Sequence, residues 1–208
     1  MIASPHRPTS PIIVLLAAGE SLRYGDIKQL VEIDGQPMVR RVARTVLDQG
    51  VPVIVVTGAH AERVEAVLDD LPLQIIRHAG WQDGMGSSLA AGIRGVEASF
   101  PQASAALLCL ADQPLIGAAL FQTMLRRHGE APERLLVTEQ DGTSGPPVLF
   151  PRDCFAALTV LSGPHGAHTL IKREAARVER FGVVNGGDVD TPQDLQRIRD
   201  WLATNASR

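Results

Sequence analysis

The segment at residues 16–28, LAAGESLRYGDIK, carries residue types suited to binding phosphate groups. Its small residues would let backbone N–H groups approach an anion, and two cations follow them, Arg23 and Lys28. Backbone amides can form a concave anion site, and an arginine can bind two phosphate oxygens at once. The spacing matches neither the dinucleotide fingerprint nor a P-loop. We predict a polyphosphate site here, with an ordinary glycine turn and two solvated cations as the alternative.

Acidic residues at two other places could bind a metal ion. Asp112 follows the most apolar run of the chain, and Asp188 and Asp190 precede its last helical segment. A carboxylate in an apolar segment is costly unless it binds something positive. Mg²⁺ prefers one or two carboxylates together with substrate phosphates, which suits Asp112. Taken alone, Asp190 is better explained by capping of the helix that begins near Thr191.

A glycine–serine segment, GMGSS at residues 84–88, precedes an apolar helical stretch. Ser87 or Ser88 could cap this helix, and the free N–H groups at its start could bind an anion; the two roles are compatible. Thr57 and Gly58 follow another apolar run. Because ligands bind beyond the carboxyl ends of strands in open α/β sheets, we expect this pair to face the same site.

The elements that must position these residues follow from the hydrophobic pattern. Residues 12–17, 53–57 and 105–111 are apolar without polar alternation, which is typical of fully buried strands. Helical periodicity marks residues 37–49, 61–68, 87–98 and 116–128. This alternation predicts a three-layer α/β sandwich with a mostly parallel, Rossmann-like sheet and right-handed crossovers.

The second half of the chain is less regular. We expect short strands at residues 135–139 and 147–150 around a turn at Asp141 and Gly142. Two short helices, a further strand and a last helix that starts after Thr191 follow, at residues 153–158, 167–174, 178–184 and 192–202. Thr191 is the predicted N-cap of the last helix, with Pro192 at its first position.

Composition excludes several classes of protein. The 208 residues are 45% hydrophobic and 21% charged, and 20 Lys and Arg face 23 Asp and Glu, for a net charge of −3. This balance, without a polybasic block, disfavours general nucleic-acid or membrane-surface binding. Two cysteines exclude a disulfide framework and a multi-cysteine zinc site. We expect a cytoplasmic protein with a disordered lead-in at residues 1–11 and a single domain at residues 12–203.

Five collinear motifs resemble those of the MobA/MocA-like nucleotidyltransferases, which have the GT-A-like fold. Besides residues 16–28, they are GMGSSLAAG at 84–92, LADQP at 110–114, LSG at 161–163 and DVDTPQD at 188–194. The resemblance extends over residues 12–200. The LAAG opening is similar to the branch that transfers CMP from CTP to molybdopterin, whereas the GMP-transferring branch typically shows LAGG. The resemblance therefore implies CTP as the first choice of nucleotide and GTP as the second.

The resemblance also implies roles for individual residues. Arg23, Lys28 and Asp112 would be catalytic, and Asp112 with Asp190, or Asp188 in its place, would hold Mg²⁺. The nucleotide-binding set would comprise Leu16, Ala17, Ala18, Gly19, Arg23, Lys28, Thr57, Gly58, Gly86, Ser87 and Ser88. A phosphate oxygen of the acceptor would attack the α-phosphorus and release pyrophosphate, which requires no Ser-His-Asp or Cys-His set.

The acceptor side departs from the family pattern. It would comprise Gly145, Pro146, Ser162, Gly163 and His165. Where family members often show His, Asp and Arg, this chain has Pro146, Pro164 and His168. Molybdopterin is the first expected acceptor, and a molybdenum hydroxylase the expected recipient of the product. The alternatives are a guanylyl- or sugar-phosphate nucleotidyltransferase, or a non-transferase accessory or redox relative that serves such hydroxylases.

Overall fold

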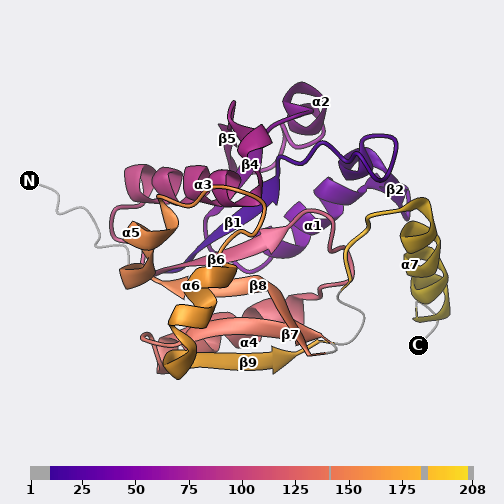
Figure 1. Cartoon of the computed structure of the whole chain (residues 1–208). Helices are drawn as coiled ribbons and strands as arrows, with labels where there is room; N and C mark the ends of the chain where they lie inside the picture. Colours follow the sequence, from indigo (N-terminus) through magenta and orange to yellow (C-terminus); the bar gives the residue numbers. More distant parts are fainter. Residues whose placement is uncertain (1–9, 141, 184–186, 206–208) are drawn as a thin grey trace, which may run out of the picture.

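Seven strands form one sheet in the order β5-β4-β1-β6-β8-β7-β9 in the computed structural model, which describes residues 10–140, 142–183 and 187–205 (Figure 1). The strands are β1 (Ile12–Ala17), β4 (Val53–Thr57), β5 (Gln74–Arg77), β6 (Ala105–Leu110), β7 (Leu135–Gln140), β8 (Thr143–Pro151) and β9 (Val178–Gly182). Residues 1–9 of the predicted lead-in lie outside the described residues.

The half of the sheet around β1 is parallel. β1 pairs in parallel with β4 and β6, and β4 pairs in parallel with β5. All residues of β1, β4 and β6 are buried, as expected for strands covered on both faces. The three apolar strands predicted from the sequence are therefore confirmed. The edge strand β5 was not predicted, because its four residues begin with Gln74, end with Arg77 and form no apolar run.

The other half of the sheet is mixed. β8 runs antiparallel to β6 and β7, and β9 pairs in parallel with β7. β8 is longer than predicted, and its register with β7 shifts between Val137 and Thr138, opposite Pro146 and Pro147. Proline has no N–H group for the ladder, which accounts for the interruption. Asp141 of the predicted turn lies outside the described residues.

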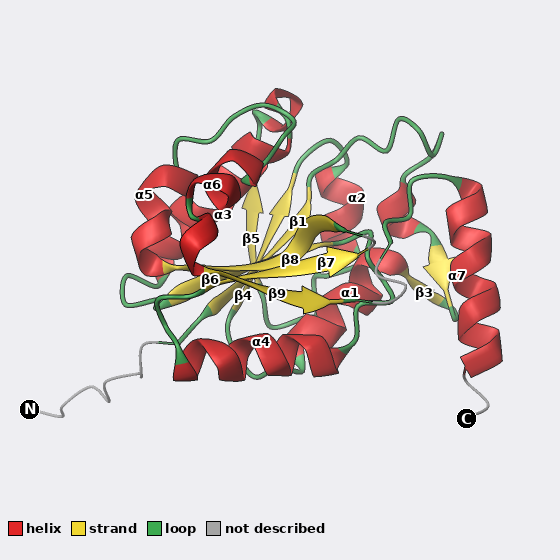
Figure 2. Ribbon diagram, turned by 60° about the horizontal axis from the view of Figure 1, so that its bottom comes forward, coloured by secondary structure: helices red, strands yellow, loops and turns green. Residues whose placement is uncertain are grey.

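Helices cover both faces of the sheet (Figure 2). One face carries α1 (Met38–Leu47), α2 (Ala61–Ala66) and α4 (Ala118–Glu130), and the other carries α3 (Met85–Ser99), α5 (Phe155–Leu158) and α6 (His168–Arg173). The connecting 3-10 helices are η1 (Lys28–Leu30), η2 (Trp81–Asp83), η3 (Arg152–Cys154) and η4 (Ala175–Arg177). The predicted helices are confirmed with ends shifted by a few residues. Within the described part of the chain, none of them has the length and apolarity needed to cross a membrane.

A small third core lies beside the sheet. It joins α7 (Pro192–Asn205) to the hairpin of β2 (Glu32–Ile33) and β3 (Gln36–Pro37). The Thr191 hydroxyl accepts a hydrogen bond from the Asp194 N–H at 3.2 Å, and the Asp194 carboxylate accepts one from the Thr191 N–H at 2.8 Å. This reciprocal cap confirms the predicted start of the helix. The Val189 N–H donates to the Asp112 carbonyl at 2.9 Å, which brings the segment before α7 to the carboxyl end of β6.

Candidate active site

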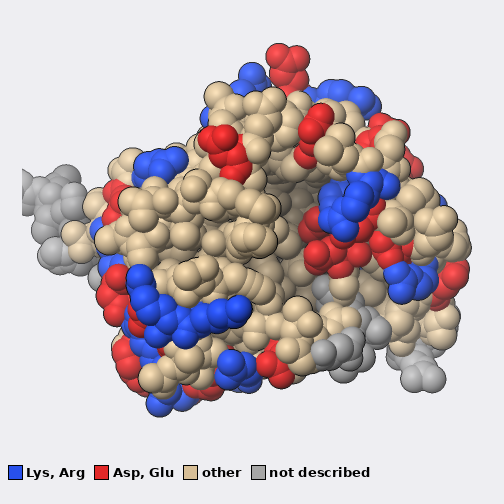
Figure 3. Space-filling view, viewed as in Figure 1, with Lys and Arg blue, Asp and Glu red and all other residues tan. Residues whose placement is uncertain are grey.

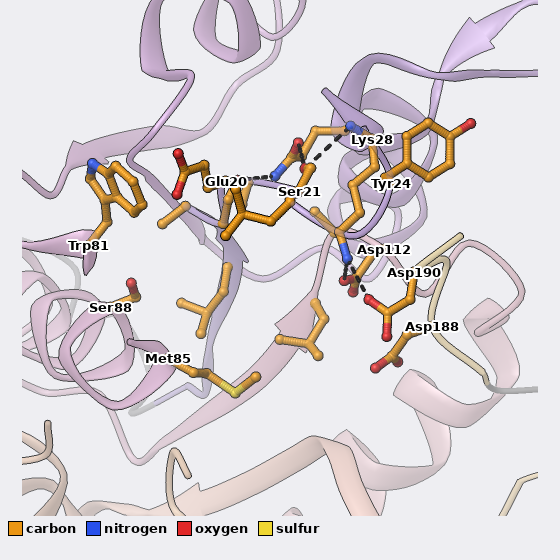
Figure 4. A pocket seen from close by; sticks show the side chains of 18 of the residues that line it. Glu20, Ser21, Tyr24, Lys28, Trp81, Met85, Ser88, Asp112, Asp188 and Asp190 are labelled. Atoms are coloured by element: carbon orange, nitrogen blue, oxygen red, sulfur yellow. Dashed lines mark hydrogen bonds and ion pairs between the residues drawn. The ribbon is translucent and has the colours of Figure 1, made fainter. Parts of the chain in front are cut away.

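A cavity of about 520 Å³ opens at the carboxyl ends of β1 and β6 (Figure 4). Its lining comes from the loop after β1, the start of η1, the turn between η2 and α3, the end of β6 and the segment before α7. This is the edge at which an open α/β sheet binds its ligands. The predicted residues Leu16, Ala17, Ala18, Gly19, Arg23, Lys28, Ser88, Asp112 and Asp190 all belong to the lining. We call this space the charged cavity.

Gln29 holds the glycine-rich loop in place. Its amide nitrogen donates to the Gly19 carbonyl at 2.8 Å, and its amide oxygen accepts from the Ser21 hydroxyl at 2.9 Å. Ser21 has a φ of +64°, and its hydroxyl also accepts from the Lys28 N–H at 3.3 Å. Gln29 is buried, so these bonds are shielded from water. Sequence reasoning missed Gln29 because a single glutamine outside any motif gives no signal.

Lys28 contacts one aspartate from each of the two acidic segments predicted to bind a metal ion. Its Nζ lies 2.7 Å from Asp112 Oδ2 and 3.0 Å from Asp190 Oδ1 (Figure 4). Arg23 Nη2 lies 2.9 Å from Asp190 Oδ2. Burial acts to lower the pKa of Lys28, but the two carboxylates outweigh it and raise that pKa above its ordinary value. The structure thus brings together predicted residues from three distant parts of the chain, with the lysine in its charged form.

Negative charge is in excess at this end of the cavity, where three aspartates face two cations. Asp112 Oδ1 is buried and has no hydrogen-bond partner in the described structure. Asp188 is exposed as a residue, yet its carboxylate reaches inward and accepts a hydrogen bond from Gln113 Nε2 at 2.9 Å. Desolvation by the surrounding protein, together with the charges of Asp112 and Asp190, raises the pKa of Asp188 to about 6. An unpaired buried oxygen and surplus negative charge fit a bound cation.

The carboxylates fit a divalent cation that shares its ligands with a substrate. In the described part of the chain, no three His, Cys, Asp or Glu side chains form a group that could hold a metal ion. Mg²⁺ usually takes one or two carboxylates and completes its shell with phosphate oxygens and water. Asp112 and Asp190, which both contact Lys28, supply such a pair of carboxylates.

The neighbouring serines at the start of α3 have different surroundings. The Ser87 hydroxyl lies 2.9 Å from the Gly84 carbonyl oxygen, and 3.0 Å from His78 Nε2. Ser88 lines the charged cavity, and no hydrogen bond of its hydroxyl is found among the described residues. The sequence prediction named both serines. The structure uses Ser87 inside the turn and leaves Ser88 available to a ligand.

Several other predicted residues support the cavity walls instead of lining them. Thr57 is fully buried, and its hydroxyl donates to Glu65 Oε1 at 2.7 Å. A Cβ at Gly58 would lie 2.7 Å from the Ala18 carbonyl oxygen and 2.8 Å from Trp81 Cβ. Glycine at position 58 therefore allows the loop after β1 to approach η2 closely. Thr57 and Gly58 lie at the predicted edge of the sheet, but neither is in the lining of the charged cavity.

The loop at Ser162 and Gly163 packs against the start of α3. The Gly86 N–H donates to the Gly163 carbonyl at 2.9 Å, and a Cβ at Gly86 would lie 2.6 Å from the Ser162 carbonyl oxygen. The predicted nucleotide-binding residue Gly86 and the predicted acceptor-side pair thus contact one another. Gly86, Ser162 and Gly163 are absent from the lining of the charged cavity and from that of a second cavity described next.

A second cavity, of about 280 Å³, adjoins the first and shares Met85 with it. It contains the predicted acceptor-side residues Gly145, Pro146 and His165, together with His168. Its lining includes no Lys, Arg, Asp or Glu among the described residues, and we call it the histidine cavity. Figure 3 shows acidic and basic side chains gathered on one side of the central hollow, opposite uncharged residues.

Gln113 connects the two cavities. Its Nε2 donates to the Pro146 carbonyl at 3.1 Å as well as to Asp188. The buried Gln113 side chain therefore connects Asp188 to β8, which lines the histidine cavity. Neither Gln113 nor Met85 was singled out from the sequence.

Residues 13–178 match the family model of the MobA-like NTP transferase domain. The chain belongs to this family. It is 30% identical over 198 residues to nicotine blue oxidoreductase of Paenarthrobacter nicotinovorans, which covers 89% of this chain and 94% of that relative. It is 29% identical over 206 residues to the probable molybdenum cofactor guanylyltransferase of Natronomonas pharaonis, with 91% and 97% covered.

A solved structure supports the same assignment. The crystal structure of Rv0371C of Mycobacterium tuberculosis H37Rv in complex with manganese superposes with a TM-score of 0.76 at 25% identity, and the match covers 92% of this chain and 99% of that one. The α/β fold with a mostly parallel sheet is thus shared with a structural neighbour. The MobA-like family assignment confirms the resemblance found in the sequence and makes the chain an enzyme of the nucleotidyltransferase type.

Proposed function

We propose that this MobA-like protein transfers CMP from CTP to the phosphate group of a molybdopterin-type acceptor and releases pyrophosphate. The observation that carries the proposal is the position of Lys28 Nζ between Asp112 and Asp190, beside the glycine-rich loop. Cations for a triphosphate and carboxylates for a metal thus meet at one edge of the sheet. The choice of CTP rests on the LAAG sequence at residues 16–19.

Each charged side chain has a task in this reaction. Backbone N–H groups of the loop after β1, with Lys28 and Arg23, would bind the β- and γ-phosphates. An acceptor phosphate oxygen attacks the α-phosphorus and forms a new P–O bond. The P–O bond between the α-phosphorus and the bridging oxygen breaks, and pyrophosphate leaves with its electron pair. Because the nucleophile is already charged, positioning and charge neutralisation supply the acceleration without a strong general base.

Asp112 and Asp190 would hold Mg²⁺. When bound, this ion neutralises charge that develops on the phosphate oxygens. Lys28 and Arg23 neutralise the same carboxylates in the structure described here. A triphosphate gives both cations alternative partners, so nucleotide binding would free carboxylate oxygens for the metal. The structure of the relative with manganese supports a divalent ion in this family.

The acceptor would occupy the histidine cavity, next to the charged cavity and separated from it by Met85. The relative named as a probable molybdenum cofactor guanylyltransferase supports molybdopterin as the acceptor and keeps GTP as the alternative nucleotide. The Pro146, Pro164 and His168 departures keep a sugar phosphate as the alternative acceptor. A molybdenum hydroxylase in the cytoplasm would receive the product.

Pyrophosphate release tests this proposal. The purified protein is incubated with molybdopterin and Mg²⁺, and with CTP or GTP, in parallel with mixtures that lack the metal or the acceptor. We expect release with CTP that depends on both Mg²⁺ and acceptor. Release with GTP alone would replace the cytidylyl assignment with the guanylyl one, and no release with any nucleotide would contradict nucleotidyl transfer.

The identity to nicotine blue oxidoreductase favours one second candidate, a redox activity, for which a nicotinamide dinucleotide is the cofactor to test. The loop after β1 lacks the G-x-G-x-x-G spacing of dinucleotide-binding sites, which weighs against it. Thermal-shift measurements with CTP, GTP, NADH and NADPH separate the two candidates. Stabilisation by NADPH but not by CTP with Mg²⁺ would support the redox candidate.

A further inference from the structure

The charged cavity has two chemically different ends. One end carries Lys28, Arg23 and the aspartates, and the other carries Trp81 with Ser88. Figure 4 shows the Trp81 indole at the opposite end of the cavity from the Lys28 ammonium group, extending toward Glu20. A ligand with its triphosphate on Lys28 would place the rest of the molecule toward Trp81. Trp81 was not among the residues predicted from the sequence.

The Trp81 backbone is held in place by neighbouring segments, and its ring is accessible from the cavity. Its side chain packs against the large core cluster on one side and lines the cavity on the other. Its carbonyl accepts a hydrogen bond from the Gly84 N–H at 3.1 Å, which closes η2. Gly58 lets the Trp81 backbone approach the loop after β1, because any Cβ there would collide with Trp81 Cβ and the Ala18 carbonyl. A side chain held in this way can present a ring face at little entropic cost.

Tyr24 is the other aromatic residue in the described lining, and it belongs to the opposite end. It packs against the third core beneath α7, near the charged residues. Among the described lining residues, only Trp81 thus provides an aromatic surface at the end of the cavity away from the triphosphate. Ser88 adds a hydroxyl without a hydrogen-bond partner in the described structure at the same end.

We infer that Trp81 is the stacking surface for the nucleobase, with the Ser88 hydroxyl as a hydrogen-bond partner of the base or ribose. This inference rests on the proposed nucleotidyl transfer and assigns the nucleoside-binding end of that site. Every nucleobase has a π face, so stacking supplies affinity for nucleosides in general, and hydrogen bonds at the rim supply the choice among them. The indole packs against the core on one side, which explains why it can bind a base without rearrangement.

Tryptophan fluorescence reports on this contact directly. The chain has two tryptophans, and Trp201 lies on α7 outside the charged cavity. The Trp201→Phe variant therefore leaves Trp81 as the single reporter. We expect CTP with Mg²⁺ to quench its emission with saturation. Inorganic tripolyphosphate, which has no base, should bind by calorimetry and leave the emission largely unchanged.

Substitutions at position 81 separate stacking from packing. Trp81→Ala should weaken CTP binding by roughly 5- to 100-fold, the range for loss of one base–aromatic contact, with tripolyphosphate affinity unchanged. Trp81→Phe, which retains a ring, should recover most of the affinity. Trp81→Leu, which fills apolar space without a ring, should not. Calorimetric titration measures all three, and circular dichroism verifies their folding.

The outcomes distinguish this inference from the function on which it rests. Suppose that Trp81→Ala binds each ligand, CTP and tripolyphosphate, as tightly as the wild type does, and that CTP does not quench the emission of Trp81. The stacking assignment is then wrong, while the nucleotide site stands. If Trp81→Leu binds CTP as tightly as the wild type, the indole acts by packing, which also overturns the inference. If neither ligand binds the wild type, the proposed function itself fails.

Discussion

The charged cavity and the histidine cavity share the Met85 side chain but differ in how they are built. The charged cavity draws two cations and three aspartates from three distant segments, and ion pairs join both cations to Asp190 and one of them, Lys28, to Asp112. The histidine cavity is enclosed by β8 and the approach to α6, and apart from two histidines and Ser144 its lining side chains are apolar. A Gln113 side chain is the polar link between them.

In the proposed function, the charged cavity would handle phosphate charge and the histidine cavity would select the other substrate. The charged residues coincide with the motifs that resemble the family, whereas the histidine cavity contains each of the three departures, Pro146, Pro164 and His168. Phosphoryl chemistry depends on charge placement, which tolerates little change. An acceptor pocket can vary in shape and polarity while that chemistry stays the same.

The largest effect should follow removal of the Asp112 charge. Asp112→Asn keeps the shape of the side chain but removes a proposed metal ligand and the 2.7 Å ion pair with Lys28. We expect CTP-dependent pyrophosphate release to fall by roughly 1,000-fold, since metal-assisted charge stabilisation supplies several kcal/mol. Asp69→Asn, the same change at an exposed residue outside both cavities, should retain full activity. Normal turnover by Asp112→Asn would contradict the assignment of a metal site to this cavity.

The two cations should differ in their contribution to triphosphate binding. Lys28 is held among carboxylates with 12% of its side chain exposed, whereas the Arg23 side chain is 76% exposed. Lys28→Met should weaken tripolyphosphate binding by roughly 100-fold and Arg23→Met by roughly tenfold, because water screens the exposed charge. Calorimetric titration gives both dissociation constants. A larger loss for Arg23→Met would place the phosphate chain outside the buried part of the cavity.

The separation of the two substrates should appear at His165. His165→Ala changes the histidine cavity without altering the lining of the charged cavity. We expect the KM for the acceptor to rise roughly five- to tenfold through loss of one hydrogen-bonding ring, and the Kd for CTP to stay within about twofold. Steady-state kinetics with varied acceptor and a CTP titration provide the two numbers. Equal changes in both would mean that the cavities act as one.

Substitution of Gly84, between the two cavities, should lower the stability of the protein. Gly84 has a φ of +90°, and a Cβ there would lie 2.6 Å from the Gly163 carbonyl carbon and oxygen. Gly84→Ala should lower the free energy of unfolding by about 1–3 kcal/mol, measured by urea titration. Gly129→Ala is the matched control, since nothing lies within 4 Å of its Cβ position in α4, and it should cause no loss. Equal stability of the two variants would contradict the close packing around Gly84.

The smallest effect concerns a histidine outside both cavities. His128 is buried on α4, and burial lowers its pKa below the ordinary 6.5. The unfolded chain therefore takes up this proton more readily than the folded one, so the free energy of unfolding should decline as pH falls below 6.5. The decline from one group cannot exceed about 1.4 kcal/mol per pH unit. His128→Gln should flatten the curve of urea midpoint against pH, and an unchanged slope would assign it to other groups.

The fold was largely predictable because its dominant signals are local. Three buried apolar strands and the reciprocal cap of Thr191 and Asp194 follow from residue types at fixed spacing. The edge strand β5 escaped because four residues with polar ends form no pattern. The hairpin of β7 and β8 was predicted from its turn, but the antiparallel pairing of β8 with β6 and the position of β9 beside β7 were not, because the neighbour of a strand depends on the packing of the whole sheet.

The site was predictable where charge marks it and unpredictable where packing does. Lys28, Asp112 and Asp190 converge, as the resemblance to the family implies. Gln29 and Gln113 each make two tertiary side-chain hydrogen bonds, which residue spacing alone does not predict. Thr57, Gly58 and Gly86 were predicted to bind the nucleotide, but the Thr57 hydroxyl bonds Glu65 and the two glycines permit close contact between protein segments.

The position of the transferred phosphorus tests the central claim most directly. CTP labelled at the α-phosphate, and in a separate reaction at the γ-phosphate, is incubated with the protein, Mg²⁺ and molybdopterin, and the products are separated by chromatography. We predict that the α-label appears in the acceptor and the γ-label in pyrophosphate, with neither transfer in the Asp112→Asn variant. Transfer of the γ-label to the acceptor, or a wild-type protein that leaves both labels in CTP, would contradict nucleotidyl transfer at the Lys28–Asp112 site.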